Sequence, residues 1–312
     1  MLVGDNMGDK DRQHTVPKAY LKHFADVVRK GQYYLHMYDR AIGKVVHTNI
    51  NNVAIERDFY TLDALEDPME WENFYSKQIE PIQATVGTAL IERANSCLTR
   101  NRSIVFPPNV QASLAMLMVY QLYRGRAARK FAEQLSAQTI PETVADIREK
   151  VGDASIVAFD EAINRIISNP KYIKPLLAEV MTDPKRLQNI AAYFIRTRIW
   201  VLYRIIGNRE FITSDNPVMF VNNQTGDPMP YHNGLARSTT ATFYPISPQL
   251  LLATYAKDNG LSLYESIDKR IVFIDAERDA RFIDSHNKWQ YQQCDRQVFA
   301  SSENVLDKIC CH

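Results

Sequence analysis

Residues 209–218 read Arg-Glu-Phe-Ile-Thr-Ser-Asp-Asn-Pro-Val, and this stretch places a short apolar strand directly before a polar turn. We predict the strand at 211–213 and the turn at Ser214, Asp215 and Asn216. Asp and Asn side chains bond nearby backbone in turns, and Pro217 disfavours the α region for the residue before it. A carboxylate held at the end of a core strand is a common way to present a catalytic or ligand-binding group. A purely structural turn is the alternative interpretation of the same residues.

The chain on the C-terminal side of this stretch has the pattern of β-strands. Strand-like segments joined by Asn, Gly and Pro loops are predicted at 218–221, 240–244, 250–255 and 271–274. Asp275 is predicted to cap a last helix that reaches about Cys294, and a short strand follows at 298–301. Two prolines exclude a central ladder position for 244–248, which predicts an edge, a bulge or a rigid loop there.

The chain on the N-terminal side begins with short elements. A helix is predicted from Thr15, with Thr15 as its N-cap and Pro17 in its first turn. Strands are predicted at 32–40 and 45–48, joined by a turn at 41–44, and a third short strand at 59–62.

A long helical block follows these strands. Apolar residues at helical spacing run from Trp71 to Leu90 across Pro81, which should kink or divide that helix. A buried helix is predicted at 110–135, and three or four more helices over 141–205. One of these begins at Asp183-Pro184 and is expected to carry Ile199, Trp200 and Leu202.

Strands at both ends of the chain with helices between them predict an α+β fold. We expect a single domain over residues 13–302, with a mixed or antiparallel sheet formed from both chain ends. A helical insertion occupies about 69–205, and a β-rich part covers about 209–302. Because the N-terminal hairpin is too small to be stable alone, it should share a sheet with C-terminal strands.

The composition is typical of a globular protein: 312 residues, 46% hydrophobic, 23% charged and a formal net charge of +1. This charge gives no overall attraction to nucleic acid, so any basic patch must be local. No apolar run is long enough for a membrane span. The N-terminus lacks the pattern of a secretory signal, and four scattered cysteines fit reduced thiols. We therefore expect a cytoplasmic protein with no membrane association.

His14 and Glu80 are candidate acid–base residues. His14 precedes the first predicted helix, where an imidazole serves as general acid or base, or simply bonds a carbonyl. Glu80 lies at the predicted kink beside Pro81, where it either turns inward or stays exposed.

Gln121 and Arg124 interrupt the most apolar helix, and their i, i+3 spacing puts them on one helix face. A buried arginine needs a carboxylate or a phosphate. The pair is therefore either an anion clamp or part of a structural salt bridge, with Glu80 or Asp215 as partner. Arg126 and Arg129 are interpreted as solvated surface charges.

Several well-known sites are absent from the sequence. The histidines have no metal-ligand spacing and HEXXH is missing, so we expect no zinc site. Walker A, GxGxxG, GxSxG, kinase and EF-hand motifs are absent too, as is a basic-aromatic RNA-binding motif.

Taken in order, these pieces resemble the DUF4238 family of bacterial and fungal proteins, a domain of unknown function. The resemblance covers about residues 13–302 and rests on these positions: His14 to Pro17, Tyr20, Leu21, Phe24, Asn52, Val53, Asp58 to Tyr60, Ile79, Glu80, Gln121, Arg124, Phe211 to Val218, Pro245 to Pro248 and Asn287. Thr15 stands where the family more often has an aromatic residue, and Gly125 where it typically has a proline. The resemblance implies no settled activity.

The polar residues among these positions include a base, carboxylates and an anion-binding arginine, which are the residue types of an active site. Our leading hypothesis is a hydrolase or transferase acting on a phosphate-containing substrate, in the manner of a nuclease-like effector. His14, Asp215 and Glu80 would be catalytic, with Asp215 orienting His14 or sharing a divalent cation with Glu80. Substrate would be bound by Arg124, Gln121, Asn216 and Ser214.

Two alternatives to this hypothesis remain open. In the first, the protein is a non-catalytic binding or regulatory module whose His, Arg and Asp residues form a buried structural network. In the second, it handles nucleotides or NAD without the usual fingerprint. The cofactor is left unknown, with a divalent cation as the candidate. Nucleic acid, nucleotides, a protein partner and a second copy of the chain are all possible partners.

Overall fold

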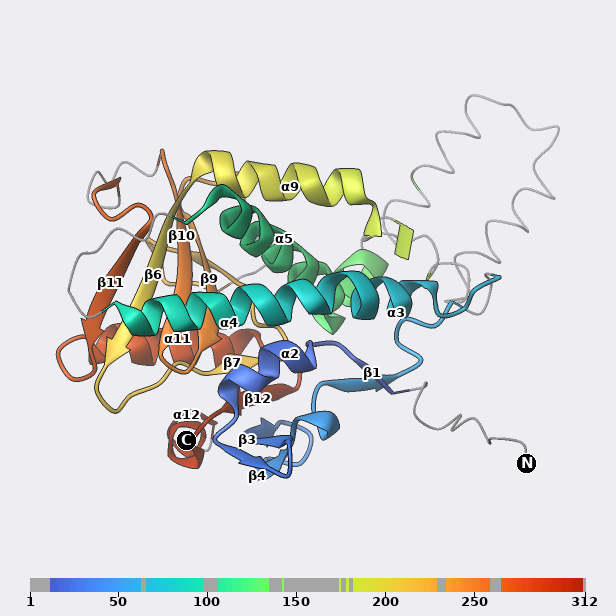
Figure 1. Cartoon of the computed structure of the whole chain (residues 1–312), viewed down its shortest axis with the longest axis horizontal. Coiled ribbons are helices and arrows are strands. Elements are labelled where there is room, and N and C mark those ends of the chain that lie inside the picture. Colours follow the sequence, from blue (N-terminus) through green and yellow to red (C-terminus); the bar gives the residue numbers. More distant parts are fainter. Residues whose placement is uncertain are drawn as a thin grey trace.

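The computed structural model describes residues 12–62, 66–97, 106–134, 182–228, 234–258 and 265–310, with four single positions at 142, 174, 178 and 179. These residues form two five-stranded sheets, a two-stranded ribbon and several helices packed together (Figure 1). The α+β class predicted from the sequence is confirmed.

The larger sheet has the strand order β11-β6-β10-β9-β8 and comes entirely from the C-terminal half of the chain. Its strands are β6 (Arg198–Ile206), β8 (Met219–Asn222), β9 (Thr240–Ser247), β10 (Leu250–Ala256) and β11 (Arg270–Asp275). β11 runs parallel to β6 and the other pairs are antiparallel, so the sheet is mixed. A register shift between Leu250 and Leu251 puts a bulge beside Pro245, at the end of β9 that lies beyond its pairing with β8.

Helices cover both faces of this sheet. α4 (Glu80–Ser96), α5 (Pro108–Arg124) and α9 (Pro184–Thr197) cover one face, and α11 (Ala280–Gln293) covers the other (Figure 1). Along β6, Trp200 and Leu202 join the core under α4, α5 and α9, whereas Val201 and Tyr203 pack with Ile283 of α11. Alternate residues of one strand thus feed two separate cores.

The smaller sheet joins the two ends of the chain. Its strands are β2 (Val27–Arg29), β3 (Gln32–Asp39), β4 (Lys44–Asn49), β7 (Thr213–Ser214) and β12 (Gln297–Ala300). β3 pairs with β12 at Met37 and Phe299, which confirms the shared sheet predicted for the N-terminal hairpin. α12 (Glu303–Cys310) packs over β3 and β12 through Leu306. Because β7 belongs to the smaller sheet and β8 to the larger one, the polar turn at 215–218 links the two sheets.

The helix that crosses Pro81 is divided, as predicted. α3 (Glu70–Phe74) is followed by the π-helical turn η3 (Tyr75–Ile79) and then by α4, which has Pro81 in its first turn, where its missing N–H costs nothing. α9 begins at the predicted cap, since the Asp183 carboxylate accepts from the backbone N–H groups of Lys185 and Arg186. α5 ends at Arg124, and a further helical stretch at 126–134 follows Gly125.

Some local predictions are wrong where long-range contacts override local pattern. No strand forms at 59–62; instead β5 (Ile55–Arg57) pairs with β1 (Arg12–His14). Thr15 does not cap a helix, because its N–H and its hydroxyl both donate to the Ala54 carbonyl, at 2.8 and 3.2 Å.

The elements nearest Thr15 are short. α2 (Lys18–Leu21) begins after Pro17 and continues into the 3₁₀ turn η1 (Lys22–Phe24), and η2 (Ile50–Asn52) is a second 3₁₀ turn.

Other boundaries also differ from prediction. The strand predicted at 211–213 is β7 at Thr213–Ser214, so Ser214 lies in a strand rather than in the turn. Ile199, Trp200 and Leu202 lie in β6 rather than in a helix, because a run buried on both faces carries no period that separates strand from helix. The last helix predicted from Asp275 begins at Ala280, and the Asp275 carboxylate closes the preceding turn onto the N–H groups of Glu277 and Arg278. α12 was not predicted. Most of the helices predicted over 141–181 lie outside the described residues. Within the described part of the chain, no helix is both long and apolar enough to cross a membrane.

Candidate functional site

Arg124, the last residue of α5, is the centre of a buried polar cluster. Its side chain is 1% exposed. Its Nε and Nη2 atoms both donate to the His14 carbonyl oxygen, at 3.0 and 2.8 Å, and Nη2 also donates to Glu80 Oε1 at 2.9 Å. The guanidinium lies over the Tyr75 ring, 4.8 Å from its centroid. A buried charge of this kind is tolerated because it is paired and hydrogen-bonded.

Gln121 and Glu80 support the same cluster. Gln121, one helical turn before Arg124, donates from Nε2 to the Thr15 carbonyl at 3.3 Å. The predicted i, i+3 pair therefore does share a face, and it binds two consecutive carbonyls at His14 and Thr15. Glu80 is the first residue of α4, so the division of the helix at Pro81 positions its carboxylate. The structure thus brings together four of the predicted site residues: His14, Glu80, Gln121 and Arg124.

Several polar atoms of this region are buried without a hydrogen-bond partner among the described residues, and three of them are Arg124 Nη1, His14 Nε2 and Glu72 Oε2. They belong to α5, β1 and α3. Burial and the neighbouring Lys18, Arg124 and Arg12 lower the pKa of His14 to about 4, so the imidazole is neutral at pH 7. Burial raises the pKa of Glu72, although the positive charge of Arg124 opposes that shift. The cluster therefore combines a neutral base, a readily protonated acid and an N–H donor.

Glu72 is a member of the cluster that sequence reasoning missed. Glu72 and Glu80 are eight residues apart, which in a regular α-helix turns their side chains about 80° from each other. The π-helical turn η3 between them absorbs roughly one extra residue and so restores a shared direction. The charge of Arg124 lowers the pKa of Glu72 and that of Glu80 raises it, so both charges act on the Glu72 carboxyl. In the sequence, only Pro81 indicated that the helix is irregular here and that side-chain directions change along it.

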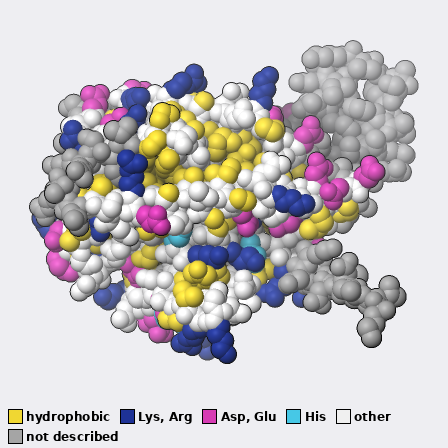
Figure 2. Space-filling view, viewed as in Figure 1, with side chains coloured by type: hydrophobic (Ala, Val, Ile, Leu, Met, Phe, Trp, Pro, Cys, Tyr) yellow, Lys and Arg dark blue, Asp and Glu magenta, His cyan; other side chains and the backbone are white. Residues whose placement is uncertain are grey.

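Positive charge surrounds the cluster on one side. Lys18, the first residue of α2, is exposed and forms no ion pair within the described chain, while Arg12 donates to Asn51 and Asn52. Basic side chains gather over α2 in Figure 2, next to histidine side chains. Arg12, Lys18 and Arg124 against Glu72 and Glu80 leave one excess positive charge when all are ionised. An anionic ligand would be attracted to this side.

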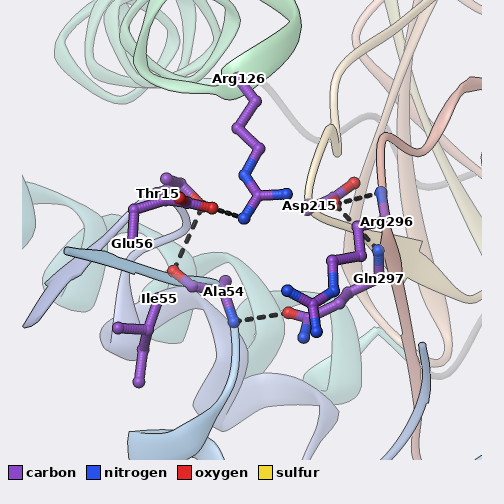
Figure 3. A pocket seen from close by; sticks show the side chains of 8 residues that line it. All are labelled: Thr15, Ala54, Ile55, Glu56, Arg126, Asp215, Arg296 and Gln297. Atoms are coloured by element: carbon purple, nitrogen blue, oxygen red, sulfur yellow. Dashed lines mark hydrogen bonds and ion pairs between the residues drawn. The ribbon is translucent and has the colours of Figure 1, made fainter. Parts of the chain in front are cut away.

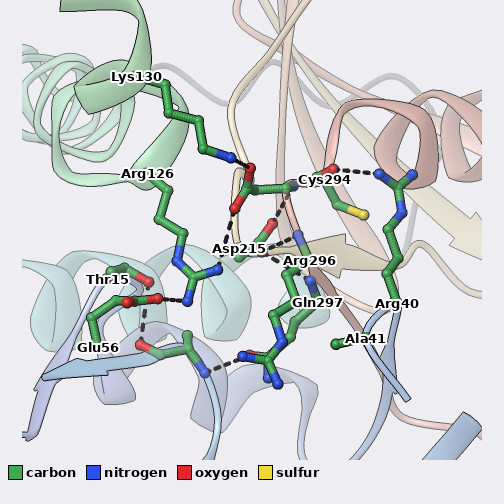
Figure 4. A network of polar contacts seen from close by, with 12 residues as sticks. Thr15, Arg40, Ala41, Glu56, Arg126, Lys130, Asp215, Cys294, Arg296 and Gln297 are labelled. Carbon is green, nitrogen blue, oxygen red and sulfur yellow. Dashed lines mark hydrogen bonds and ion pairs between the residues drawn. The ribbon is translucent and has the colours of Figure 1, made fainter. Parts of the chain in front are cut away.

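The Asp215 carboxylate lies in a second cluster, where its bonds go to the backbone (Figure 4). Oδ1 accepts from the Asp295 N–H at 2.9 Å, and Oδ2 accepts from the N–H groups of Arg296 and Gln297 at 2.7 and 2.9 Å. Burial raises the pKa of Asp215, and these three donors oppose the shift. The structure does not bring this carboxylate to His14 or to Glu80, because both its oxygens hold the loop before β12.

Ser214 and Asn216 are bound to α11. Ser214 Oγ accepts from Gln290 Nε2 at 2.6 Å and from the Asn216 N–H at 3.1 Å. The Asn216 carbonyl accepts from Gln290 and from Gln293, at 3.1 and 2.7 Å. One turn earlier on α11, the Asn287 side chain accepts from the Ile212 N–H and donates to the Glu210 carbonyl. The 210–216 stretch is thus fastened along its length.

A small cavity lies between Asp215 and the β1–β5 ribbon (Figure 3). Its lining residues are Thr15, Ala54, Ile55, Glu56, Arg126, Asp215, Arg296 and Gln297, and its volume is about 10 Å³. That is space for about one water molecule, so it is too small for a substrate. Arg126 crosses it and pairs with Glu56 and Asp295, while Arg129 donates to the Phe59 carbonyl at 2.7 Å. Neither arginine is the solvated surface charge that the sequence suggested.

The fold and the site define an α+β protein built around a buried arginine cluster and a fastened Asp-Asn turn. The family model described as "Protein of unknown function (DUF4238)" matches residues 12–304, nearly the whole chain, and the protein belongs to this family. No curated protein and no solved structure matches it.

Proposed function

We propose that the protein is a hydrolase or transferase that acts on a phosphate-containing substrate at the Arg124 cluster, as a nuclease-like enzyme would. One observation carries the proposal. Three complementary atoms from three elements, on His14, Glu72 and Arg124, are buried without partners among the described residues, beside an excess of positive charge. Buried polar groups are normally satisfied, so a group of unsatisfied ones supports a ligand site.

The pKa directions suggest the roles. Burial lowers the pKa of His14 and raises that of Glu72, so it favours the neutral form of both groups, and groups with such perturbed pKa values cluster at functional sites. His14, neutral at pH 7, would accept a proton from the attacking hydroxyl or water at Nε2. Glu72, whose pKa is raised, would give a proton to the leaving oxygen. Arg124 Nη1 and Lys18 would bind phosphate oxygens, and Glu80 and Gln121 would hold Arg124 and the His14 backbone in place.

In this proposal Ser214, Asp215 and Asn216 do not contact the substrate and stabilise the site indirectly. Their bonds hold α11 and the loop before β12. Gln297, the first residue of β12, donates to Asp215 from its N–H and accepts from the Ala54 N–H through its side chain. Ala54 in turn binds Thr15, next to His14. We also place the activity in the cytoplasm, since Cys97 and Cys294 are buried thiols that form no disulfide.

The rival function is a non-catalytic binding or regulatory module. It is favoured by the number of bonds that Arg124 and Asp215 make to backbone, which is what a packing network would show. In the catalytic function the unpartnered atoms of His14, Glu72 and Arg124 take part in a reaction, whereas in the binding module they do not. Neutral, isosteric substitutions at these residues therefore distinguish the two functions.

The test is a turnover screen with four probes: bis(p-nitrophenyl) phosphate, single-stranded RNA, single-stranded DNA and nucleoside phosphates. Wild type is compared with His14→Gln, Glu72→Gln and Lys18→Gln. Lys22→Gln is the matched control, since Lys22 is an exposed lysine of the same surface that lies over the Tyr33 ring. We expect His14→Gln and Glu72→Gln to lower the rate by on the order of a hundredfold or more and Lys22→Gln to leave it unchanged. Folded variants with wild-type rates, or a wild type that turns over none of the probes, would favour the rival.

A further inference from the structure

Asp26, His36 and His47 lie close together at the N-terminal hairpin, although their spacing in the sequence matches no metal-binding motif. His36 of β3 and His47 of β4 are directly paired across the strands, and their ring centroids are 4.6 Å apart. Asp26 immediately precedes β2, which flanks β3 on its other edge, and the Asp26 N–H donates to the Tyr34 carbonyl at 3.0 Å. Sequence spacing missed the group because strand pairing, rather than a local motif, assembles it.

The three side chains present ligand atoms to one another. Asp26 Oδ1 lies 2.9 Å from His47 Nε2, and Asp26 Oδ2 lies 3.5 Å from His36 Nε2. One ligand atom from each residue lies within 4.8 Å of the other two. Ligands bound to zinc at 2.0–2.2 Å in a tetrahedron are separated by about 3.3 Å, so the observed spacings need only small adjustments.

The surroundings also suit a cation. The two histidines are the ion-pair partners of the Asp26 carboxylate within the described residues. The side chains of Asp26, His36 and His47 are 22%, 16% and 32% exposed, which leaves a path for an ion. His36 Nδ1 is buried without a partner among the described residues, so its ring lacks there the second hydrogen bond that usually fixes a metal-binding histidine.

From this geometry we propose that Asp26, His36 and His47 bind a divalent first-row transition metal, with Zn²⁺ as the best fit. The ligands would be the two Nε2 atoms and one carboxylate oxygen, and a fourth position would face solvent. Two imidazoles and a carboxylate are a common set for such metals. The missing second hydrogen bond at His36 predicts weaker binding than in a closed four-ligand site. This proposal is independent of the Arg124 cluster and corrects the expectation that the histidines have no metal partners.

The experiment is a Zn²⁺ titration of the full, tag-free chain after chelator treatment, followed by calorimetry. A Co²⁺ absorbance titration reports the ligand type. We expect one equivalent to bind at this site with nitrogen and oxygen ligands. His47→Gln and Asp26→Asn should each weaken that binding roughly tenfold or more, because even indirect partners of metal ligands matter by about that factor. Val46→Gln is the control, since Val46 is the exposed neighbour of His47 on the other face of β4.

Three outcomes would overturn the proposal. The first is the absence of Zn²⁺ binding by wild type, which would leave Asp26 as a carboxylate hydrogen-bonded to two imidazoles. The second is unchanged binding in both His47→Gln and Asp26→Asn. The third is a Co²⁺ spectrum with strong thiolate bands, which would place the ion at cysteines instead. Asp26→Asn keeps the Asp26 backbone bond to Tyr34, so it remains informative if His47→Gln does not fold.

Discussion

The Arg124 cluster and the Asp215 cluster are both buried and both contact the segment around His14 to Ala54, yet they use their hydrogen-bonding capacity differently. The Asp215 carboxylate accepts three backbone N–H groups and holds one loop. The Arg124 cluster leaves Arg124 Nη1, Glu72 Oε2 and His14 Nε2 without partners in the part of the chain that the structure describes. An unsatisfied buried polar group costs about 1–3 kcal/mol, so a folded protein retains several together only where other interactions offset them. The difference marks the Asp215 cluster as structural and the Arg124 cluster as the candidate site.

The largest expected effect comes from removing the Arg124 charge. Arg124→Met deletes the bonds to the His14 carbonyl and leaves Glu80 and Glu72 in a buried region without their cation. We expect the free energy of unfolding to fall by about 3–5 kcal/mol, measured by urea denaturation. Arg126→Met is the control, since Arg126 is also paired with carboxylates but is partly exposed, and it should cost about 1 kcal/mol or less. Equal costs for the two variants would contradict the central position of Arg124.

The next effect is a pH dependence that reports on His14. Its pKa is about 4 in the folded protein and near 6.5 when unfolded, so the unfolded state binds the extra proton between these values. Stability should therefore decline as the pH falls from about 6.5 to 4, by on the order of 3 kcal/mol for this residue.

His286 and His23 also have lowered pKa values and contribute in the same direction, so the measurement is the difference between wild type and His14→Gln across that window. His14→Gln should lose less stability on acidification. Parallel curves for the two proteins would show that His14 titrates normally.

The third prediction concerns the backbone hydrogen bonds that the Asp215 carboxylate accepts. Asparagine forms a turn at position 215 nearly as well as aspartate, so the sequence alone predicts a small cost for Asp215→Asn. The structure predicts otherwise, because the amide nitrogen of asparagine cannot accept the backbone N–H groups that an oxygen of Asp215 accepts. We expect a loss of about 1–3 kcal/mol in unfolding free energy and unchanged function at temperatures where the variant is folded. A stable variant with lost activity would instead make Asp215 catalytic.

The smallest expected effects are melting-temperature changes of opposite sign on substitution of two glutamates. Burial raises the pKa of Glu72, so its ionised form destabilises the fold at neutral pH, and Glu72→Gln should melt slightly higher than wild type. This gain should shrink as the pH falls through the folded pKa and vanish below about 4, where the carboxyl is protonated in both states. Glu80→Gln, the same substitution, should instead melt lower because it removes the partner of Arg124. Shifts of the same sign would contradict the difference between the two carboxylates.

Much of the framework is predictable from sequence because its signals are local. Pro81 divides its helix, Asp183 caps α9, and the 32–48 hairpin forms with its predicted turn. Polar residues inside an apolar helix at Gln121 and Arg124 correctly indicate one cluster with His14 and Glu80.

What could not be predicted depends on contacts between distant parts of the chain. The partners of Asp215 are backbone groups at 295–297, which carry no sequence mark. β6 is buried on both faces and so shows no strand period. Glu72 depends on a π-helical turn, and the His36–His47 pair depends on strand register.

The most direct test of the central claim is calorimetric titration of inorganic phosphate into three proteins: wild type, Arg124→Lys and Asp215→Asn. Lysine keeps the charge but lacks the planar fork, so it cannot hold the His14 carbonyl, Glu80 and a ligand together. We expect wild type and folded Asp215→Asn to bind phosphate with similar affinity, and folded Arg124→Lys to bind it much more weakly. Unchanged phosphate binding by an Arg124→Lys protein with a lowered melting temperature, or no phosphate binding by wild type, would contradict this expectation and make both clusters structural.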